Sequence, residues 1–82
     1  MAAKPKRIVL TLTCLDAPEV VVSFEPEGAQ HTLVRGDHFR VEMVGPDDGD
    51  PEISHSPDGL GVWRWSTADV RVWNKAGDEL PT

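Results

Sequence analysis

The 82-residue sequence lacks several features through which small domains gain stability or reach a membrane. It has one cysteine, Cys14, so no disulfide can form within the chain. No apolar run approaches the roughly 18 residues of a membrane-spanning helix. The basic residues 1–7 precede alternating Leu and Thr rather than the apolar stretch of a secretory signal. We therefore expect a domain without a membrane partner, located in the cytoplasm or in a particle assembled from it.

Stretches without glycine or proline are scarce, and most of them alternate apolar and polar residues. Such alternation is typical of strands that bury one face. It predicts strands near residues 7–14, 19–25, 31–35, 38–44, 60–65 and 70–73. The sequence thus predicts one all-β domain over residues 1–82, with a flexible basic tail at residues 1–6. We expect a small antiparallel β-sandwich or barrel of six to seven short strands.

Positive charge is also scarce, since 8 Lys and Arg stand against 14 Asp and Glu, a formal net charge of -6. Residues 45–58 hold no Lys or Arg but five acidic residues: Asp47, Asp48, Asp50, Glu52 and Asp58. We expect this segment to form a long acidic loop, with a short edge strand around Ile53 as the alternative. Because phosphate binding needs clustered Lys and Arg, the charge argues against direct nucleic-acid binding. It is compatible with a basic protein partner.

No catalytic or metal-binding signature is present. The possible metal ligands outside the acidic segment lack zinc-motif spacing: Cys14, His31, His38 and His55. Residues 47–52 do not follow the calcium-loop pattern, and Pro51 interrupts them. Ser54, His55 and Asp58 are so close along the chain that a turn explains them better than a catalytic triad. We expect a protein that is not an enzyme and that uses neither a cofactor nor a metal.

The three tryptophans are the most informative residues in a chain with two phenylalanines and no tyrosine. Trp63 and Trp65 are two positions apart, so they would share one face of a strand while Val62 faces the other way. Trp73 would share a face with Arg71. Both faces of this C-terminal hairpin are therefore apolar, and either both are covered by core or one binds a partner. We predict a protein interface formed by Trp63, Trp65, Arg71 and Trp73.

These features predict a non-catalytic protein-interaction or structural module that binds a protein partner or self-associates. Few lysines beside many Arg, Ala, Gly, Asp and Val residues are typical of GC-rich bacterial or phage genes. A small virion or accessory component would fit such a gene. Two alternatives stay open. One is an acidic mimic that inhibits a basic or nucleic-acid-binding protein, and the other is a small carbohydrate-binding module that uses surface tryptophans.

Overall fold

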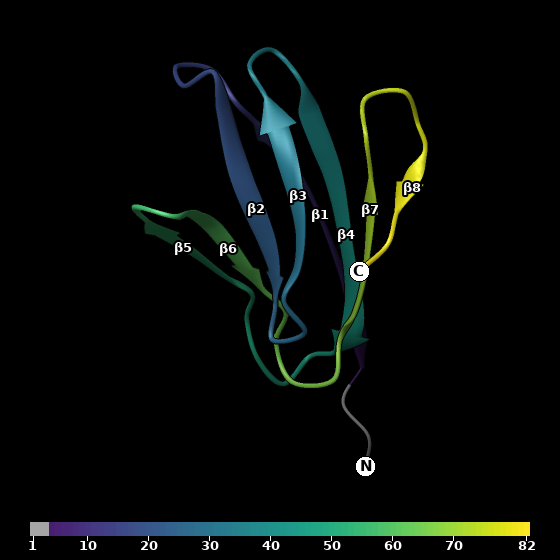
Figure 1. Cartoon of the computed structure of the whole chain (residues 1–82). Helices are drawn as coiled ribbons and strands as arrows, with labels where there is room; N and C mark the ends of the chain where they lie inside the picture. Colours follow the sequence, from purple (N-terminus) through teal and green to yellow (C-terminus); the bar gives the residue numbers. More distant parts are fainter. Residues whose placement is uncertain (1–3) are drawn as a thin grey trace.

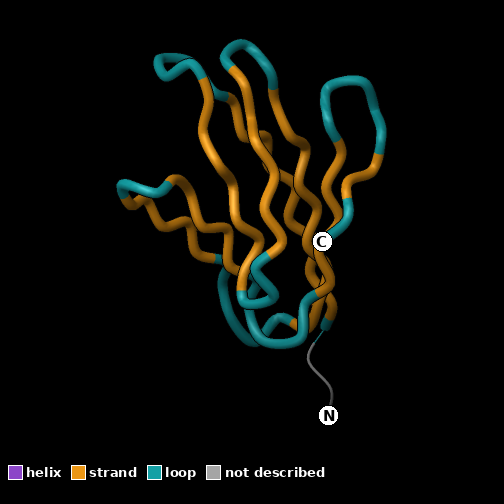
Figure 2. Tube along the Cα trace, viewed as in Figure 1, coloured by secondary structure: helices purple, strands orange, loops and turns teal. Residues whose placement is uncertain are grey.

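The computed structural model describes residues 4–82, and all regular structure in that part of the chain is β-strand. The strands are β1 (Pro5–Thr13), β2 (Glu19–Glu25), β3 (Ala29–Val34), β4 (His38–Pro46), β5 (Glu52–Ser56), β6 (Gly59–Trp63), β7 (Asp69–Trp73) and β8 (Glu79–Leu80). They form sheet A, in the order β1-β4-β7-β8, and sheet B, in the order β3-β2-β6-β5 (Figures 1 and 2). The predicted all-β class is confirmed, with eight strands instead of six or seven.

Neighbouring strands are antiparallel with one exception. β2 and β6 run parallel, with Val22 opposite Leu60 and Phe24 opposite Val62. The chain therefore leaves sheet B after β3, contributes β4 to sheet A, and returns to sheet B as β5 and β6. A parallel pair needs a crossover of this kind, because a tight turn can join only antiparallel strands.

The core lies between the two sheets, where alternation along the strands directs apolar side chains inward. In sheet A, Val41 of β4 pairs with Leu10 of β1 and with Val72 of β7, so three strands build one continuous apolar face. The buried apolar residues are Cys14, Val22, Phe24, Leu33, Phe39, Val41, Met43, Val62, Trp65, Ala68 and Val72. Burial of a large apolar side chain contributes about 1.5–3 kcal/mol. No polar or charged residue in the range 4–82 is buried, so the charged groups described here remain at the surface.

The predicted long loop at residues 45–58 is wrong in its extent. β4 continues through Pro46, and β5 pairs with β6 so that Ile53 lies opposite Val62. The alternative of an edge strand around Ile53 is therefore what forms, and only residues 47–51 connect β4 to β5. The β5–β6 hairpin diverges from β2 and β3 at one side of the molecule (Figure 1). All five residues of β5 are exposed, because no strand of sheet A covers them.

The predicted flexible tail at residues 1–6 is also corrected. Residues 1–3 lie outside the described residues, but Pro5 and Lys6 belong to β1, where Lys6 lies opposite Gly45 of β4. The sequence does not indicate that the strand includes these two residues, because proline and lysine are uncommon in strands. The residues described contain no helix long and apolar enough to cross a bilayer.

Candidate binding surface

The structure does not bring the predicted interface residues together into one patch. Trp65 is 4% exposed and belongs to the core, whereas Trp63 is 39% exposed on the outer face of sheet B. Trp73 and Arg71 lie on the outer face of sheet A, on the opposite side of the sandwich. The prediction that Trp63 and Trp65 share a face is wrong, because β6 ends at Trp63 and its alternation ends there too. Two separate surfaces therefore carry a tryptophan with access to solvent.

Trp65 holds the β4–β5 connection against the core. Its indole Nε1 donates a hydrogen bond of 2.6 Å to the carbonyl of Pro46. Gly49 packs against it so closely that a Cβ on Gly49 would lie 3.1 Å from the Trp65 Cβ. The ammonium of Lys6 lies 4.9 Å from the indole ring centroid. This side chain is a structural anchor, which corrects its predicted place in an interface.

The acidic residues of the predicted loop are divided among three places and partly neutralised. Asp47, Asp48 and Asp50 are in the β4–β5 connection, Glu52 begins β5, and Asp58 is in the β5–β6 turn.

Lys6 of β1 reaches this connection and supplies the cation that the segment itself lacks. Its Nζ lies 3.0 Å from Asp47 Oδ1 and 3.4 Å from Asp50 Oδ1, and it also donates to the carbonyl of Gly49. The hydrogen bond with Asp47 and the negative charge of both carboxylates raise the pKa of Lys6. The connection is thus tied to β1 rather than presented as a free acidic patch.

Sheet B carries the most one-sided charge in the described chain. Its four strands contain neither lysine nor arginine, whereas the strands of sheet A contain Lys6, Arg7, Arg40 and Arg71. Strand alternation places Glu19 and Glu25 of β2 on the outer face of sheet B. Glu25 and Glu52 are the cross-strand neighbours of Trp63 in β2 and β5. We name this surface, formed by Glu19, Glu25, Glu52, Asp58 and Trp63, the acidic Trp63 face.

Trp63 is hydrogen-bonded to the neighbouring strand on this face. Its Nε1 donates a hydrogen bond of 3.2 Å to Ser54 Oγ of the adjacent β5 strand. The indole leans back over Gly61, where an added Cβ would lie 3.1 Å from Nε1 and 2.5 Å from Ser54 Oγ. Glycine at position 61 therefore leaves room for the indole to lie close to the sheet. A shallow depression of about 170 Å³ adjoins the ring, and its polar lining includes Ser23, Gln30, Glu25 and Asp58.

The outer face of sheet A differs from the acidic Trp63 face because arginine side chains contact its tryptophan. Trp73 contacts two guanidinium groups, with Arg40 Cζ 5.2 Å and Arg71 Cζ 4.9 Å from its ring centroid. Arg71 also pairs with Glu79 of β8 at 2.6 Å. That hydrogen-bonded ion pair raises the pKa of Arg71 and lowers the pKa of Glu79.

A second ion pair on this sheet joins Arg7 of β1 to Glu42 of β4 at 2.6 Å. Arg40 makes no ion pair with any residue between 4 and 82. We name the surface formed by Arg7, Arg40, Arg71 and Trp73 the arginine face.

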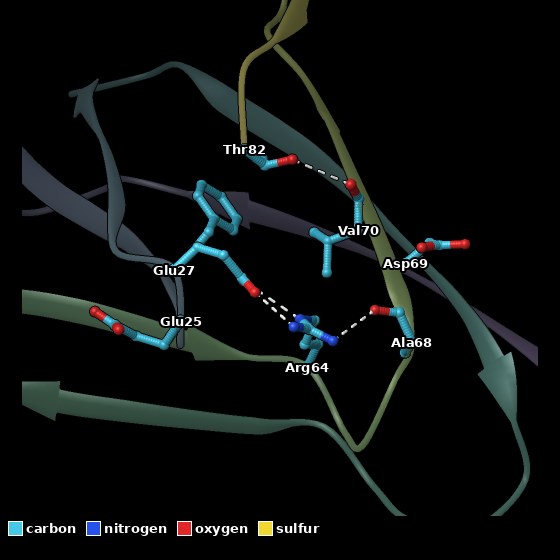
Figure 3. Close-up of a pocket in the computed structure, with 8 residues that line it drawn as sticks. Glu25, Glu27, Arg64, Ala68, Asp69, Val70 and Thr82 are labelled. Carbon is cyan, nitrogen blue, oxygen red and sulfur yellow. Dashed lines mark hydrogen bonds and ion pairs between the residues drawn. The ribbon is translucent and has the colours of Figure 1, made fainter.

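A pocket of about 240 Å³ opens where β2 approaches β7, and Arg64 lies across it (Figure 3). The guanidinium pairs with Glu27 at 2.5 Å and donates to the carbonyls of Ser66 and Ala68. The hydrogen bond from Arg64 lowers the pKa of Glu27, and the same contact raises the pKa of Arg64. Because four of its five N–H donors are engaged, Arg64 joins the β2–β3 turn to the β6–β7 connection rather than presenting a free charge to a ligand.

The described residues offer no alternative site with evident chemistry. Within residues 4–82, no three His, Cys, Asp or Glu side chains are placed to hold a metal ion. The exposed tryptophan faces are the remaining candidates for recognition. No protein-family model matches the sequence, and neither a curated protein nor a solved structure is significantly similar to the chain.

Proposed function

We propose that this chain is a non-catalytic protein-interaction module that binds a basic partner through the acidic Trp63 face. One observation carries the proposal: four strands without lysine or arginine present carboxylates on both sides of an exposed tryptophan. Carboxylates form charge-assisted hydrogen bonds with Arg and Lys, and an indole binds the same cations through its ring face. Tryptophan is also enriched among the residues that contribute most to protein interfaces.

The hydrogen bond between Trp63 and Ser54 supports this function. Ser54 accepts a hydrogen bond from the indole and Gly61 leaves room for it, so less side-chain freedom is lost when a partner binds. The uniform sign of the face would also attract basic partners from a distance and repel acidic ones. The proposed binding surface therefore lies on sheet B and not on residues 47–51, whose charge Lys6 partly neutralises.

A carbohydrate ligand is the second candidate, and the lining of the depression favours it. A sugar ring can stack its apolar face on an indole while its hydroxyls bond to polar side chains. The depression beside Trp63 offers such partners in Ser23, Gln30 and Glu25. A sugar is neutral, so its binding would not depend on salt concentration, whereas binding of a basic peptide would weaken as salt is added.

The test is an NMR titration of the ¹⁵N-labelled chain with a deca-arginine peptide, a deca-glutamate peptide and cellohexaose. We expect deca-arginine alone to shift the amide signals of β2, β5 and β6 and the indole N–H signal of Trp63. Trp63→Ala should weaken that binding about tenfold, since the ring contributes through its face and its apolar area. The control Leu15→Ala, which trims a side chain 72% exposed in the β1–β2 turn, should leave the affinity unchanged.

Each other outcome decides against the proposal. Shifts confined to cellohexaose would replace it with the carbohydrate function. Shifts from deca-arginine centred on residues 47–51, or a Trp63→Ala variant that binds as well as the original chain, would show that the acidic Trp63 face is not the binding surface.

A further inference from the structure

The two outer faces of the sandwich differ in chemistry and point in opposite directions. The core lies between the sheets, so the arginine face and the acidic Trp63 face are on opposite sides of the molecule. Each carries one tryptophan with access to solvent, and each has charged groups around that ring. A face of one kind can therefore meet a face of the other kind on a neighbouring molecule.

The charges on the two faces are complementary. The arginine face presents three guanidinium groups, of which Glu42 and Glu79 partly neutralise two, and alternation along β7 places Asp69 at the edge of the same side of the sheet. The side chains of Arg7 and Arg71 remain 56% exposed in these pairs, so their outer N–H groups can still reach a second carboxylate. Arg40 is exposed, lies against Trp73, and makes no ion pair within residues 4–82. The opposing face offers only carboxylates as charged groups.

The geometry also selects one mode of contact. Two acidic Trp63 faces brought together by a two-fold axis would place carboxylates opposite carboxylates, which is repulsive. Contact between the arginine face of one copy and the acidic face of the next places unlike charges opposite each other. Because the two faces lie on opposite sides, each contacting pair keeps one free arginine face and one free acidic Trp63 face. Further copies can therefore add to form an open chain or a closed ring.

We infer that a second copy of this chain is the partner, and that copies associate head-to-tail with the arginine face of one on the acidic Trp63 face of the next. The inference rests on the proposed function, because it names the partner of the same face. Four short strands give a small contact area, and interfaces of that size are weak and transient. Association should therefore depend on protein concentration and weaken as salt is added.

The experiment is sedimentation analysis of two variants, alone and mixed, from about 10 µM to about 1 mM protein at low salt. Arg40→Glu disables the arginine face, and Trp63→Ala disables the acidic face. The original chain should exceed the mass of a dimer at high concentration, while each variant alone should associate about tenfold more weakly. An equimolar mixture retains one intact pair of faces, so it should form dimers at concentrations at which neither variant associates alone.

Matched controls separate this outcome from general effects of charge or folding. Lys75→Glu makes the same change in net charge as Arg40→Glu but in the β7–β8 turn, and Leu15→Ala removes an exposed apolar side chain in the β1–β2 turn. Both should associate like the original chain, and circular dichroism should confirm that every variant is folded.

An original chain that stays monomeric, or a mixture that does not associate, overturns the inference. If deca-arginine still binds in that case, the proposed function stands without self-association, and if it does not, both fail.

Discussion

At the level of single residues, the three tryptophans differ in how much of each side chain remains in contact with water. Trp65 is almost completely buried and hydrogen-bonded to Pro46, Trp63 is 39% exposed, and Trp73 contacts two arginines. A buried indole contributes mainly to folding, whereas an exposed one contributes to folding only through the part that packs. The three residues should therefore respond differently to the same truncation.

Trp65→Ala should lower the free energy of unfolding by about 3–5 kcal/mol, because it opens a cavity in a small core and removes the hydrogen bond to Pro46. Trp63→Ala should cost only about 1 kcal/mol, since much of that ring already faces solvent. Urea unfolding followed by circular dichroism measures both values. Equal losses in the two variants would contradict the division of the tryptophans into core and surface.

The sequence alone does not predict that strand β6 ends at Trp63. Alternation continues in the sequence from Gly61 through Trp63 to Trp65, so nothing in the pattern marks the end of the strand. The strand ends because the chain must turn from sheet B to sheet A between β6 and β7. The contact of Lys6 with Asp50 was equally hidden, because the two residues are 44 positions apart and meet only through the register of β1 and β4.

At the level of elements, alternation predicted six strands because each of them buries one face. β5 has no buried face, so its five exposed residues could be predicted only as an alternative to a loop. β8 has two residues, too few to show a period. The sequence alone also does not show that one sheet lacks lysine and arginine. Sheet B combines β2 and β3 with β5 and β6, which come from separate segments of the chain.

The parallel junction of β2 and β6 depends on Gly59. Its φ is 137°, and an added Cβ would lie 2.1 Å from the backbone carbonyl oxygen of Val21. Gly59→Ala should therefore push β6 away from β2 and cost at least about 2 kcal/mol more than Gly77→Ala. Gly77 is a matched control, since its φ is 90° but no atom lies within 4 Å of the added Cβ. Thermal unfolding measures the difference, and equal melting temperatures would show that the junction tolerates a side chain.

At the level of the whole molecule, two exposed ion pairs respond to acid. Arg64–Glu27 links the β6–β7 connection to the β2–β3 turn, and Arg71–Glu79 joins the neighbouring strands β7 and β8. Arg64 lowers the pKa of Glu27 and Arg71 lowers the pKa of Glu79, in both cases from an ordinary value of 4.5 and mainly through hydrogen bonds. A carboxyl group whose pKa is lower in the folded state stabilises that state fully above its unfolded pKa. The contribution is then lost as the pH falls through the folded pKa.

The melting temperature should accordingly decline from about pH 4.5 downward as these carboxylates take up protons. In the double variant Glu27→Gln, Glu79→Gln the decline should be shallower, because two of the groups that titrate have been removed. Thermal melts between about pH 7 and about pH 2 measure both profiles. Profiles of identical slope would mean that these pairs add nothing to stability, as is common for exposed ion pairs.

The order in which the strands enter the two sheets has one more consequence. The chain passes from one sheet to the other between β1 and β2, β3 and β4, β4 and β5, and β6 and β7. During synthesis, β2 and β3 can pair as soon as both have emerged, but β2 waits for β6 and β1 waits for β4. Such distant pairings slow folding relative to local ones. The acidic Trp63 face is therefore assembled late, and no fragment of the chain can present it without also carrying β4.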